Sequence, residues 1–370
     1  MEYRLEELFD LQMGKTPSRS VTEYWESGNN KWISIADLSK CGKYIYDTKE
    51  CLSDIAVPES GIKQIPANTV VMSFKLSIGK TAITSEPMYS NEAIMSFRDR
   101  KLVQLLPEYI YYLLLSKNWD DGTNKAVMGK TLNKATLSKV KVNIHSMQEQ
   151  QEIVYVLNQA TALIELHQQQ LQKLDELVKA RFVELFGDPI SNPHGFDKVD
   201  LSELADIKIG QFGSLLHKGD YIEGGYALLN PSHIIDGKIA PDSELTVSRE
   251  KYEELSAYHL KAGDVVMGRR GEMGRCAVVP CDGYLCGTGS LLIRTKGDVT
   301  ADYIQKIISF PSFKKAIEDM AVGQTIPNLN VPIVSRFQII KPPIEVQHSY
   351  YAFVEQTDKS KLLQFFCFPI

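Results

Sequence analysis

The sequence lacks the features that mark membrane-spanning, secreted and most metal-binding proteins. No apolar run in its 370 residues approaches the roughly 18 that a membrane-spanning helix needs. The first twenty residues lack the apolar core of a signal peptide. The six cysteines form no Cys-x-x-Cys pair and no regular framework. We therefore expect reduced thiols and a cytoplasmic protein that does not contact a membrane.

The sequence has little that would support a metal site. The closest cysteine spacing is Cys276, Cys281 and Cys286, which would need a histidine such as His259 to hold zinc. Structural zinc ligands usually come as two pairs, each roughly two to four residues apart. A zinc site is therefore a minor alternative, and the prediction is that the chain holds no metal.

Catalytic motifs are also missing. Gly-Lys-Thr occurs at residues 14–16, 79–81 and 129–131, but none of the three has the glycine five positions earlier that a phosphate-binding loop requires. The run Asn230-Pro231-Ser232-His233 lacks the second proline and the aromatic residue of a base-flipping methyltransferase motif, so it predicts a turn. We find no loop suited to S-adenosylmethionine and no nucleophile with a plausible histidine partner. The sequence argues against an enzyme that acts alone.

What the sequence does contain is one large internal repeat. Residues 5–14 return as 201–210, residues 66–72 as 261–267, and residues 129–132 as 323–326. The order is kept and the shift varies only from 194 to 197. A period this long excludes solenoids and propellers, whose units are much shorter. The repeat predicts two tandem domains of the same fold, each large enough to bury its own core.

Each half mixes short strands with helices, which predicts an α+β fold. Strands are expected at 69–74 and 140–144, and again at 264–267 and 336–339, from their β-branched and apolar residues. Helical stretches are expected at 108–117 and 301–320.

A long helix is expected between the halves. Residues 147–186 contain no Gly and no Pro, and Leu157, Ile164, Leu171 and Val178 recur at seven-residue spacing. A helix of this length extends about 60 Å. The four apolar side chains form a stripe along it, called the seam below, which a partner helix is needed to cover. The second half begins a similar helix at about residue 342, but residues 362–370 are apolar and aromatic and include Pro369. We expect a truncated second helix packed antiparallel against the first.

These patterns predict five segments. A first domain covers residues 1–146 and a helical spacer covers 147–187. A linker covers 188–198 and a second domain covers 199–341. The truncated helix with its apolar tail covers 342–370.

The arrangement resembles the specificity subunit of type I restriction-modification systems. The likeness covers almost the whole chain. It is carried by residues 5–8 with 14–17, 201–204, 323–329, the Gln/Glu-rich run 147–154 and the helix end 185–189. It implies two target-recognition domains that read the two halves of a bipartite site in double-stranded DNA, with the paired helices fixing the gap. It also implies separate methyltransferase subunits, two in number, and restriction subunits, which would use S-adenosylmethionine, ATP and Mg²⁺; this chain would bind no cofactor.

Candidate contacts follow from local charge. The net charge of −5 argues against indiscriminate coating of nucleic acid but not against a locally basic face. Arginine suits guanine and phosphate contact, so the DNA-binding candidates are Lys75, Lys80, Arg269, Arg270, Arg275, Thr325 and Asn328. For each of them solvated surface charge or turn capping remains an alternative.

Two other functions remain open. One is a truncated or phase-variable specificity subunit with impaired assembly, and the other is a coiled-coil tether between protein-binding domains that does not bind DNA. Failure to bind duplex DNA at low salt would favour the tether.

Overall fold

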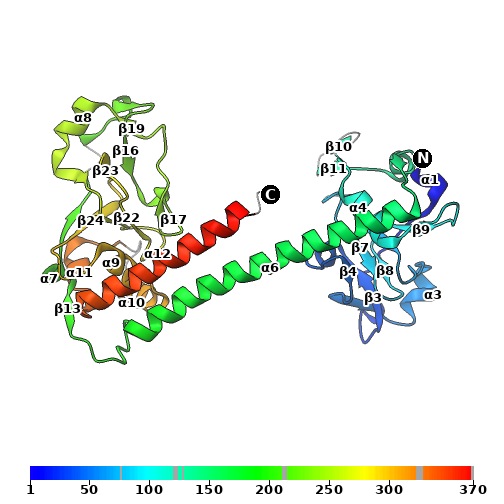
Figure 1. Ribbon diagram of the computed structural model, residues 1–370, viewed down its shortest axis with the longest axis horizontal. Helices are drawn as coiled ribbons and strands as arrows, with labels where there is room; N and C mark the ends of the chain where they lie inside the picture. The colour runs from blue at the N-terminus through cyan, green and yellow to red at the C-terminus, as the bar shows by residue number, and fades with distance from the viewer. Residues whose placement is uncertain (76, 120–123, 127–128, 211–214, 322–327, 368–370) are drawn as a thin grey trace. The chain divides into compact units, whose positions relative to one another are not determined.

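The computed structural model describes residues 1–370 except 76, 120–123, 127–128, 211–214, 322–327 and 368–370, and omits the side chains of 124–126, 129–131, 218, 321 and 363–367. The chain divides into two compact units, Met1–Leu166 and His167–Ile370. Helix α6 (Met147–Phe186) contributes to both (Figure 1). Among the described residues no helix combines the length and the apolarity needed to span a bilayer.

The first unit opens with a strand and closes on α6. Its elements before α6 are β1 (Glu2–Arg4), α1 (Leu5–Leu8), β2 (Phe9–Met13), η1 (Thr22–Tyr24), β3 (Asn30–Ile33), α2 (Ile35–Leu38), β4 (Tyr44–Ile45), β5 (Glu50–Leu52), α3 (Ala56–Ser60), β6 (Val70–Ser73), β7 (Thr81–Thr84), β8 (Tyr89–Ser90), β9 (Ile94–Asp99), α4 (Pro107–Leu115), β10 (Asn124–Ala126), β11 (Gly129–Thr131), α5 (Lys134–Ser138) and β12 (Lys141–Asn143).

The second unit has a similar but not identical order of elements after α6. Its elements are β13 (Lys198–Asp200), α7 (Leu201–Leu204), β14 (Ala205–Ile209), η3 (Lys218–Asp220), β15 (Tyr221–Ile222), β16 (Tyr226–Leu229), η4 (Pro231–His233), β17 (Ile234–Ile235), β18 (Lys238–Ile239), β19 (Thr246–Val247), α8 (Arg249–Glu254), η5 (Ser256–Tyr258), β20 (His259–Leu260), β21 (Val265–Gly268), β22 (Cys276–Val278), β23 (Tyr284–Cys286), β24 (Ser290–Thr295), α9 (Ala301–Ile308), α10 (Pro311–Ala321), α11 (Val331–Ser335), β25 (Gln338–Ile340) and α12 (Ile344–Cys367).

The two units share the same arrangement of four sheet strands, to which the first unit adds β4. The first unit has the strand order β2-β9-β6-β7-β4, and the second has β14-β24-β21-β22. The central strands β6 and β21 are buried along their whole length, which is why their sequences are nearly continuous apolar runs. The parallel pair β3–β8 recurs as β16–β23, and the antiparallel pair β1–β12 recurs as β13–β25. The prediction of two tandem α+β units is confirmed.

One predicted helix was wrong in its extent. The stretch 301–320 forms two helices, α9 and α10, instead of one continuous helix. Pro311 has no backbone N–H to donate, and its ring disfavours helical geometry at Phe310. The chain therefore leaves the helix at Ser309 and begins a new one at Pro311.

A buried glutamine ties each long helix to its own unit. Gln150 of α6 accepts a hydrogen bond from Leu106 N at 3.1 Å, just before α4. Gln347 of α12 accepts one from Thr300 N at 3.0 Å, just before α9. The side-chain amide of each glutamine also donates to backbone carbonyls, those of Gln104 and His145 for Gln150 and that of Pro342 for Gln347. Both side chains are almost fully buried, and these bonds satisfy polar groups that would otherwise be costly to bury.

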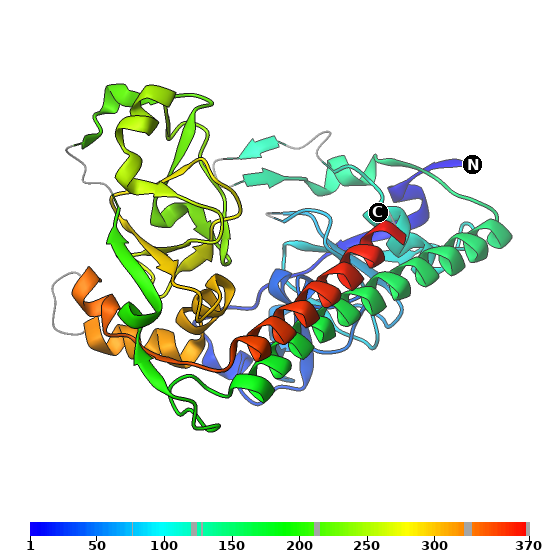
Figure 2. The ribbon, with the colours of Figure 1, turned by 60° about the vertical axis from the view of Figure 1, so that its left-hand side comes forward.

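Within the second unit, α12 packs antiparallel against the end of α6. Tyr350, near the start of α12, lies 5.5 Å from the ring of Phe182 and donates to Val178 O at 3.4 Å. Further along α12, Lys361 pairs with Asp175 at 2.7 Å, earlier in α6. The residue numbers therefore run in opposite directions along the seam, as Figure 2 shows.

The four seam candidates lie in different surroundings. Val178 packs against the second-unit core and Leu171 is half-buried. Leu157 and Ile164 belong to the first unit's part of α6 and are 36% and 43% exposed. Their role in assembly stays a prediction.

Candidate nucleic-acid interface

Five of the DNA-contact candidates, Lys75, Lys80, Arg269, Arg270 and Arg275, lie in a turn that both units share. In each unit a turn joins two buried strands, β6 to β7 and β21 to β22. The first turn residue is held on both sides by backbone bonds. Phe74 N donates to Ala93 O and Leu132 N donates to Phe74 O. Arg269 makes the same pair of bonds, from its N to Gly289 O and from Leu329 N to its O.

In the first unit both candidate lysines touch the protein. The Lys75 ammonium lies 5.3 Å from the centre of the Phe74 ring, within reach of a cation–π contact. The Lys80 ammonium donates to Ser39 Oγ. Neither lysine is paired with a carboxylate among the described residues, so both positive charges remain available to an anion.

Arg269 is held by backbone carbonyls. Its Nε donates to Leu329 O at 3.0 Å and its Nη1 to Thr288 O at 3.4 Å. Burial lowers the pKa of Arg269, and the charge of Arg270 acts in the same direction. The guanidinium thus fixes the segment around Leu329, where the first unit has the apolar side chain of Phe74.

Arg270 differs from its neighbour. Its side chain is exposed, and among the described residues no hydrogen bond or ion pair holds it. It is the candidate arginine with all of its donors free for a ligand.

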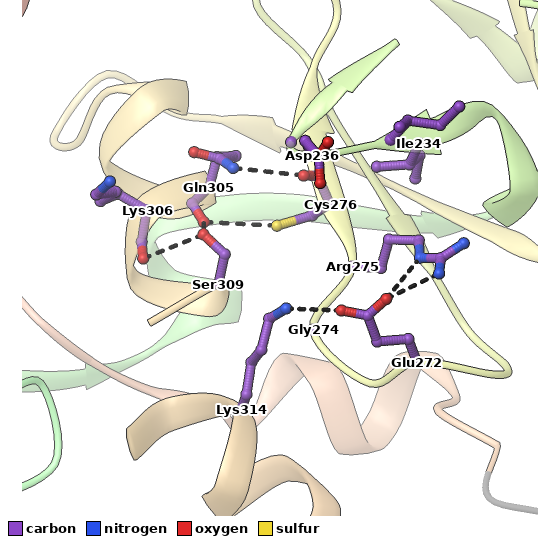
Figure 3. A pocket seen from close by; sticks show the side chains of 12 residues that line it. Ile234, Asp236, Glu272, Gly274, Arg275, Cys276, Gln305, Lys306, Ser309 and Lys314 are labelled. Atoms are coloured by element: carbon purple, nitrogen blue, oxygen red, sulfur yellow. Dashed lines mark hydrogen bonds and ion pairs between the residues drawn. The ribbon is translucent and has the colours of Figure 1, made fainter. Parts of the chain in front are cut away.

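Arg275 belongs to an ionic cluster on the other side of the turn (Figure 3). Its Nη2 lies 2.8 Å from Glu272 Oε2, and its Nη1 donates to Pro231 O at 3.3 Å. Lys314 of α10 approaches the same carboxylate at 2.9 Å. Glu272 and Lys314 were not predicted from the sequence. Lys314 lies on α10, and it reaches the turn only because α10 packs beside it in the folded unit.

The remaining two candidates are Thr325 and Asn328, and the structure describes only the second of them. Thr325 lies outside the described residues. Asn328 is half-buried, and its Oδ1 is buried without a hydrogen-bond partner in the described part of the chain.

The structure also describes the motifs set aside above. Residues 231–233 form the turn η4, as predicted, with Asn230 as its N-cap. Burial raises the pKa of Cys276 and of Cys286 to about 12, whereas Cys281 is exposed. His259 donates through Nε2 to Tyr252 O at 2.7 Å and stacks on that ring. Within the described residues no group of three or more His, Cys, Asp and Glu side chains is arranged to hold a metal ion.

The comparisons with known proteins match specificity subunits of type I restriction enzymes. A family model described as the type I restriction modification DNA specificity domain matches residues 1–176 and again 193–364. The specificity subunit of the type I restriction enzyme MjaIX from Methanocaldococcus jannaschii is 24% identical over an alignment 384 residues long. The alignment covers 95% of this chain and 85% of that protein. The HindI specificity subunit from Haemophilus influenzae is 26% identical over 162 residues, covering 43% of this chain and 34% of that protein.

Solved structures show the same fold. The S subunit of a type I restriction-modification system from M. genitalium matches with a TM-score of 0.55 at 13% identity, covering 98% of this chain and 90% of that one. A chain from a structure that describes complex assembly and conformational transition of a type I restriction-modification system matches with a TM-score of 0.63 at 16% identity. That match covers 98% of this chain and 91% of the other.

Proposed function

The chain belongs to the family of type I restriction-modification DNA specificity subunits, and on this premise we propose that its two units each read one half of a bipartite site in double-stranded DNA. The observation that carries the proposal is the double match of the family model, whose two ranges each fall largely within one of the two structurally repeated units. Divergence between the two turns, Phe74 against Arg269 for example, suits two half-sites of different sequence.

We propose that the turn residues and the segments beside them face the DNA. Lys75, Lys80, Arg269, Arg270, Arg275, Thr325 and Asn328 form this set. The free donors of Arg270 favour it for direct contact with a guanine or a phosphate. The bonds of Arg269 to Leu329 and Thr288 favour a role in holding the neighbouring backbone in place.

Replacing Arg270 with glutamine tests this assignment. We expect weaker duplex binding by about 1–3 kcal/mol if the contact is a guanine. If it is a phosphate, we expect the slope of log K against log salt to fall in magnitude by about 0.9. Arg249→Gln is the matched control, because Arg249 is equally exposed at the start of α8. Fluorescence anisotropy across a salt series measures both, and equal binding by wild type and both variants would contradict the assignment.

We propose further that the chain is a non-catalytic scaffold. DNA methylation and restriction would be carried out by separate subunits. We propose two methyltransferase subunits, together with restriction subunits. S-adenosylmethionine, ATP and Mg²⁺ would bind to those chains. The seam of Leu157, Ile164, Leu171 and Val178 would serve assembly. Because the target is DNA, we place this complex in the cytoplasm.

Co-purification with a methyltransferase subunit, followed by duplex binding, separates the alternatives. A specificity subunit should form a complex that binds duplex DNA in a salt-dependent manner. A protein tether should form complexes without binding DNA at low salt. A subunit impaired in assembly should bind one methyltransferase copy weakly, and changes within residues 362–370 should alter its stoichiometry.

A further inference from the structure

The first third of α6 is fastened to the first unit by a polar cluster that none of the proposed contacts uses. Lys43, just before β4, lies at its centre. The Lys43 ammonium donates to Glu108 Oε1 of α4 and to Asn158 Oδ1 of α6, both at 2.7 Å. It also lies 5.7 Å from the ring centres of Tyr44 and Tyr112, within reach of a cation–π contact with each. One positive charge thus joins β4, α4 and α6 (Figure 1).

The two tyrosines complete this Lys43 cluster. The Tyr112 hydroxyl donates to Asn158 Oδ1 at 2.7 Å, and the Tyr44 hydroxyl donates to Glu108 Oε1 at 3.2 Å. Burial acts to raise the pKa of Glu108, but its hydrogen bonds, that from Lys43 first, and the charge of Lys43 outweigh burial and lower the pKa. The side chains of Lys43 and Glu108 are only 23% and 29% exposed. Every member of the cluster has a partner, which is the condition for a stable buried network.

Asn158 is the furthest point along α6 at which the first unit holds the helix by a hydrogen bond. The earlier point is Gln150, whose buried side chain accepts from Leu106 N. Within residues 147–166, all of which the structure describes, no residue after Asn158 is hydrogen-bonded to another element. Two points on a straight helix define its direction, so Gln150 and Asn158 together set the direction of α6 relative to the first unit.

The length of α6 makes this direction matter. Along the helix axis Asn158 lies about 12 Å from Gln150 and Phe186 lies about 54 Å from it, at roughly 1.5 Å per residue. A shift of about 2 Å at Asn158 therefore becomes about 9 Å at Phe186. That displacement corresponds to roughly two to three base-pair steps of about 3.4 Å. Holding Asn158 in place thus limits how far the other end of α6 can move.

The repeat shows that the Lys43 cluster is particular to the first unit. Gln150 and Gln347 make equivalent bonds, and in that register Asn158 matches Glu355. Glu355 forms an exposed ion pair with Lys359 within α12 instead. In the second unit α12 packs along the end of α6, whereas the longest other helix described in the first unit is α4, with 9 residues. The polar cluster therefore supports α6 where a long companion helix does not.

Stability alone does not explain why this support is polar. Apolar side chains of similar size would stabilise the junction at least as well, because removing charges from water costs free energy. Apolar contacts, such as those of Ile153 and Val154 with the first-unit core, tolerate small shifts. Hydrogen bonds require defined lengths and angles. The cluster therefore restricts the orientation of α6 more than it adds stability.

We propose that Lys43, Glu108 and Asn158 are positioning residues that fix the direction in which α6 leaves the first unit, and so restrict the gap that the chain accepts between two half-sites. This inference rests on the proposed function, because only a chain that reads two half-sites has a gap to set. It concerns spacing and not sequence, so the bases that each unit reads should not depend on the cluster.

The test is methylome sequencing for N6-methyladenine in a host that lacks this gene and receives the methyltransferase subunit with either the wild type or Asn158→Ala. The variant removes the acceptor of both Lys43 and Tyr112. We expect the preference for the native gap over a gap one base pair longer or shorter to fall about tenfold, the factor for one to two hydrogen bonds. The half-site sequences should stay the same.

Two further variants make the comparison specific. Tyr112→Phe removes one bond to Asn158 and keeps the ring, so it should lower the gap preference by less, about threefold. It also decides the question if Asn158→Ala does not fold. Gln159→Ala is the matched control, because Gln159 is the next residue of α6, is exposed, and has no hydrogen bond from its side chain in the described part of the chain. It should keep the wild-type gap.

The outcomes separate this inference from the proposed function. A uniform loss of methylation in Asn158→Ala with an unchanged gap preference would show a purely structural role and overturn the inference. Wild-type gap preference in both Asn158→Ala and Tyr112→Phe would overturn it as well, and in either case a bipartite motif in the wild type would leave the proposed function standing. The absence of any bipartite motif in the wild type would contradict the proposed function and the inference together.

Discussion

Replacing Phe182 with alanine should remove about 3–5 kcal/mol from the free energy of unfolding of the second unit. The Phe182 ring is 1% exposed and lies within 5.5 Å of the rings of Phe310 and Tyr350. It is also 4.9 Å from Phe186. One side chain of α6 thus joins the junction between α9 and α10 to α12. Its removal would leave a cavity that three separate elements would have to collapse to fill.

Val183→Ala is the matched control for this prediction. Val183 is the next residue of α6 and is 48% exposed. Its truncation should cost about 0.5 kcal/mol or less. Denaturant unfolding followed by circular dichroism measures both variants. If the two variants unfold at the same denaturant concentration, then α12 is not anchored through Phe182 and the packing described here is wrong.

The second large effect is expected at Arg294. Its Nε and Nη2 donate to the two oxygens of Asp264 at 2.7 and 2.6 Å. The Asp264 side chain is only 3% exposed, and its carboxylate also accepts from Lys261 N, just after β20. Arg294→Ala would leave a buried carboxylate without its counter-ion. We expect a loss of about 2–3 kcal/mol, less than the 3–5 kcal/mol of a fully buried pair, because the Arg294 side chain is 36% exposed.

Lys296→Ala provides the comparison. Lys296 lies just after β24, and its ion pair with Asp206 is exposed on both sides. Exposed pairs contribute about 0–1 kcal/mol. The same unfolding measurement should therefore separate the two variants clearly. Comparable losses would mean that Asp264 is adequately solvated without Arg294.

Features set by local sequence could be predicted well. The long helix was expected at 147–186 and lies there, because a run without Gly or Pro and with seven-residue apolar spacing has no competing local structure. The tandem α+β architecture followed from the repeat. The break at Pro311 was missed, because residues 301–320 were interpreted as one helical stretch although a proline interrupts them.

The candidate site was harder to predict, because the partners of a side chain depend on contacts distant in sequence. The cluster Arg269, Arg270 and Arg275 looks uniform in the sequence. The structure separates it into an arginine bonded to backbone carbonyls, a free arginine and an arginine paired with Glu272. Lys314 joins this cluster only through the packing of α10 on the turn.

The most direct test of sequence recognition is methylome sequencing of the host for N6-methyladenine, with and without this gene. We predict a bipartite motif with a fixed gap that disappears when the gene is deleted and returns when it is restored. Persistence of every such motif after deletion would contradict the claim that this chain selects the methylated site.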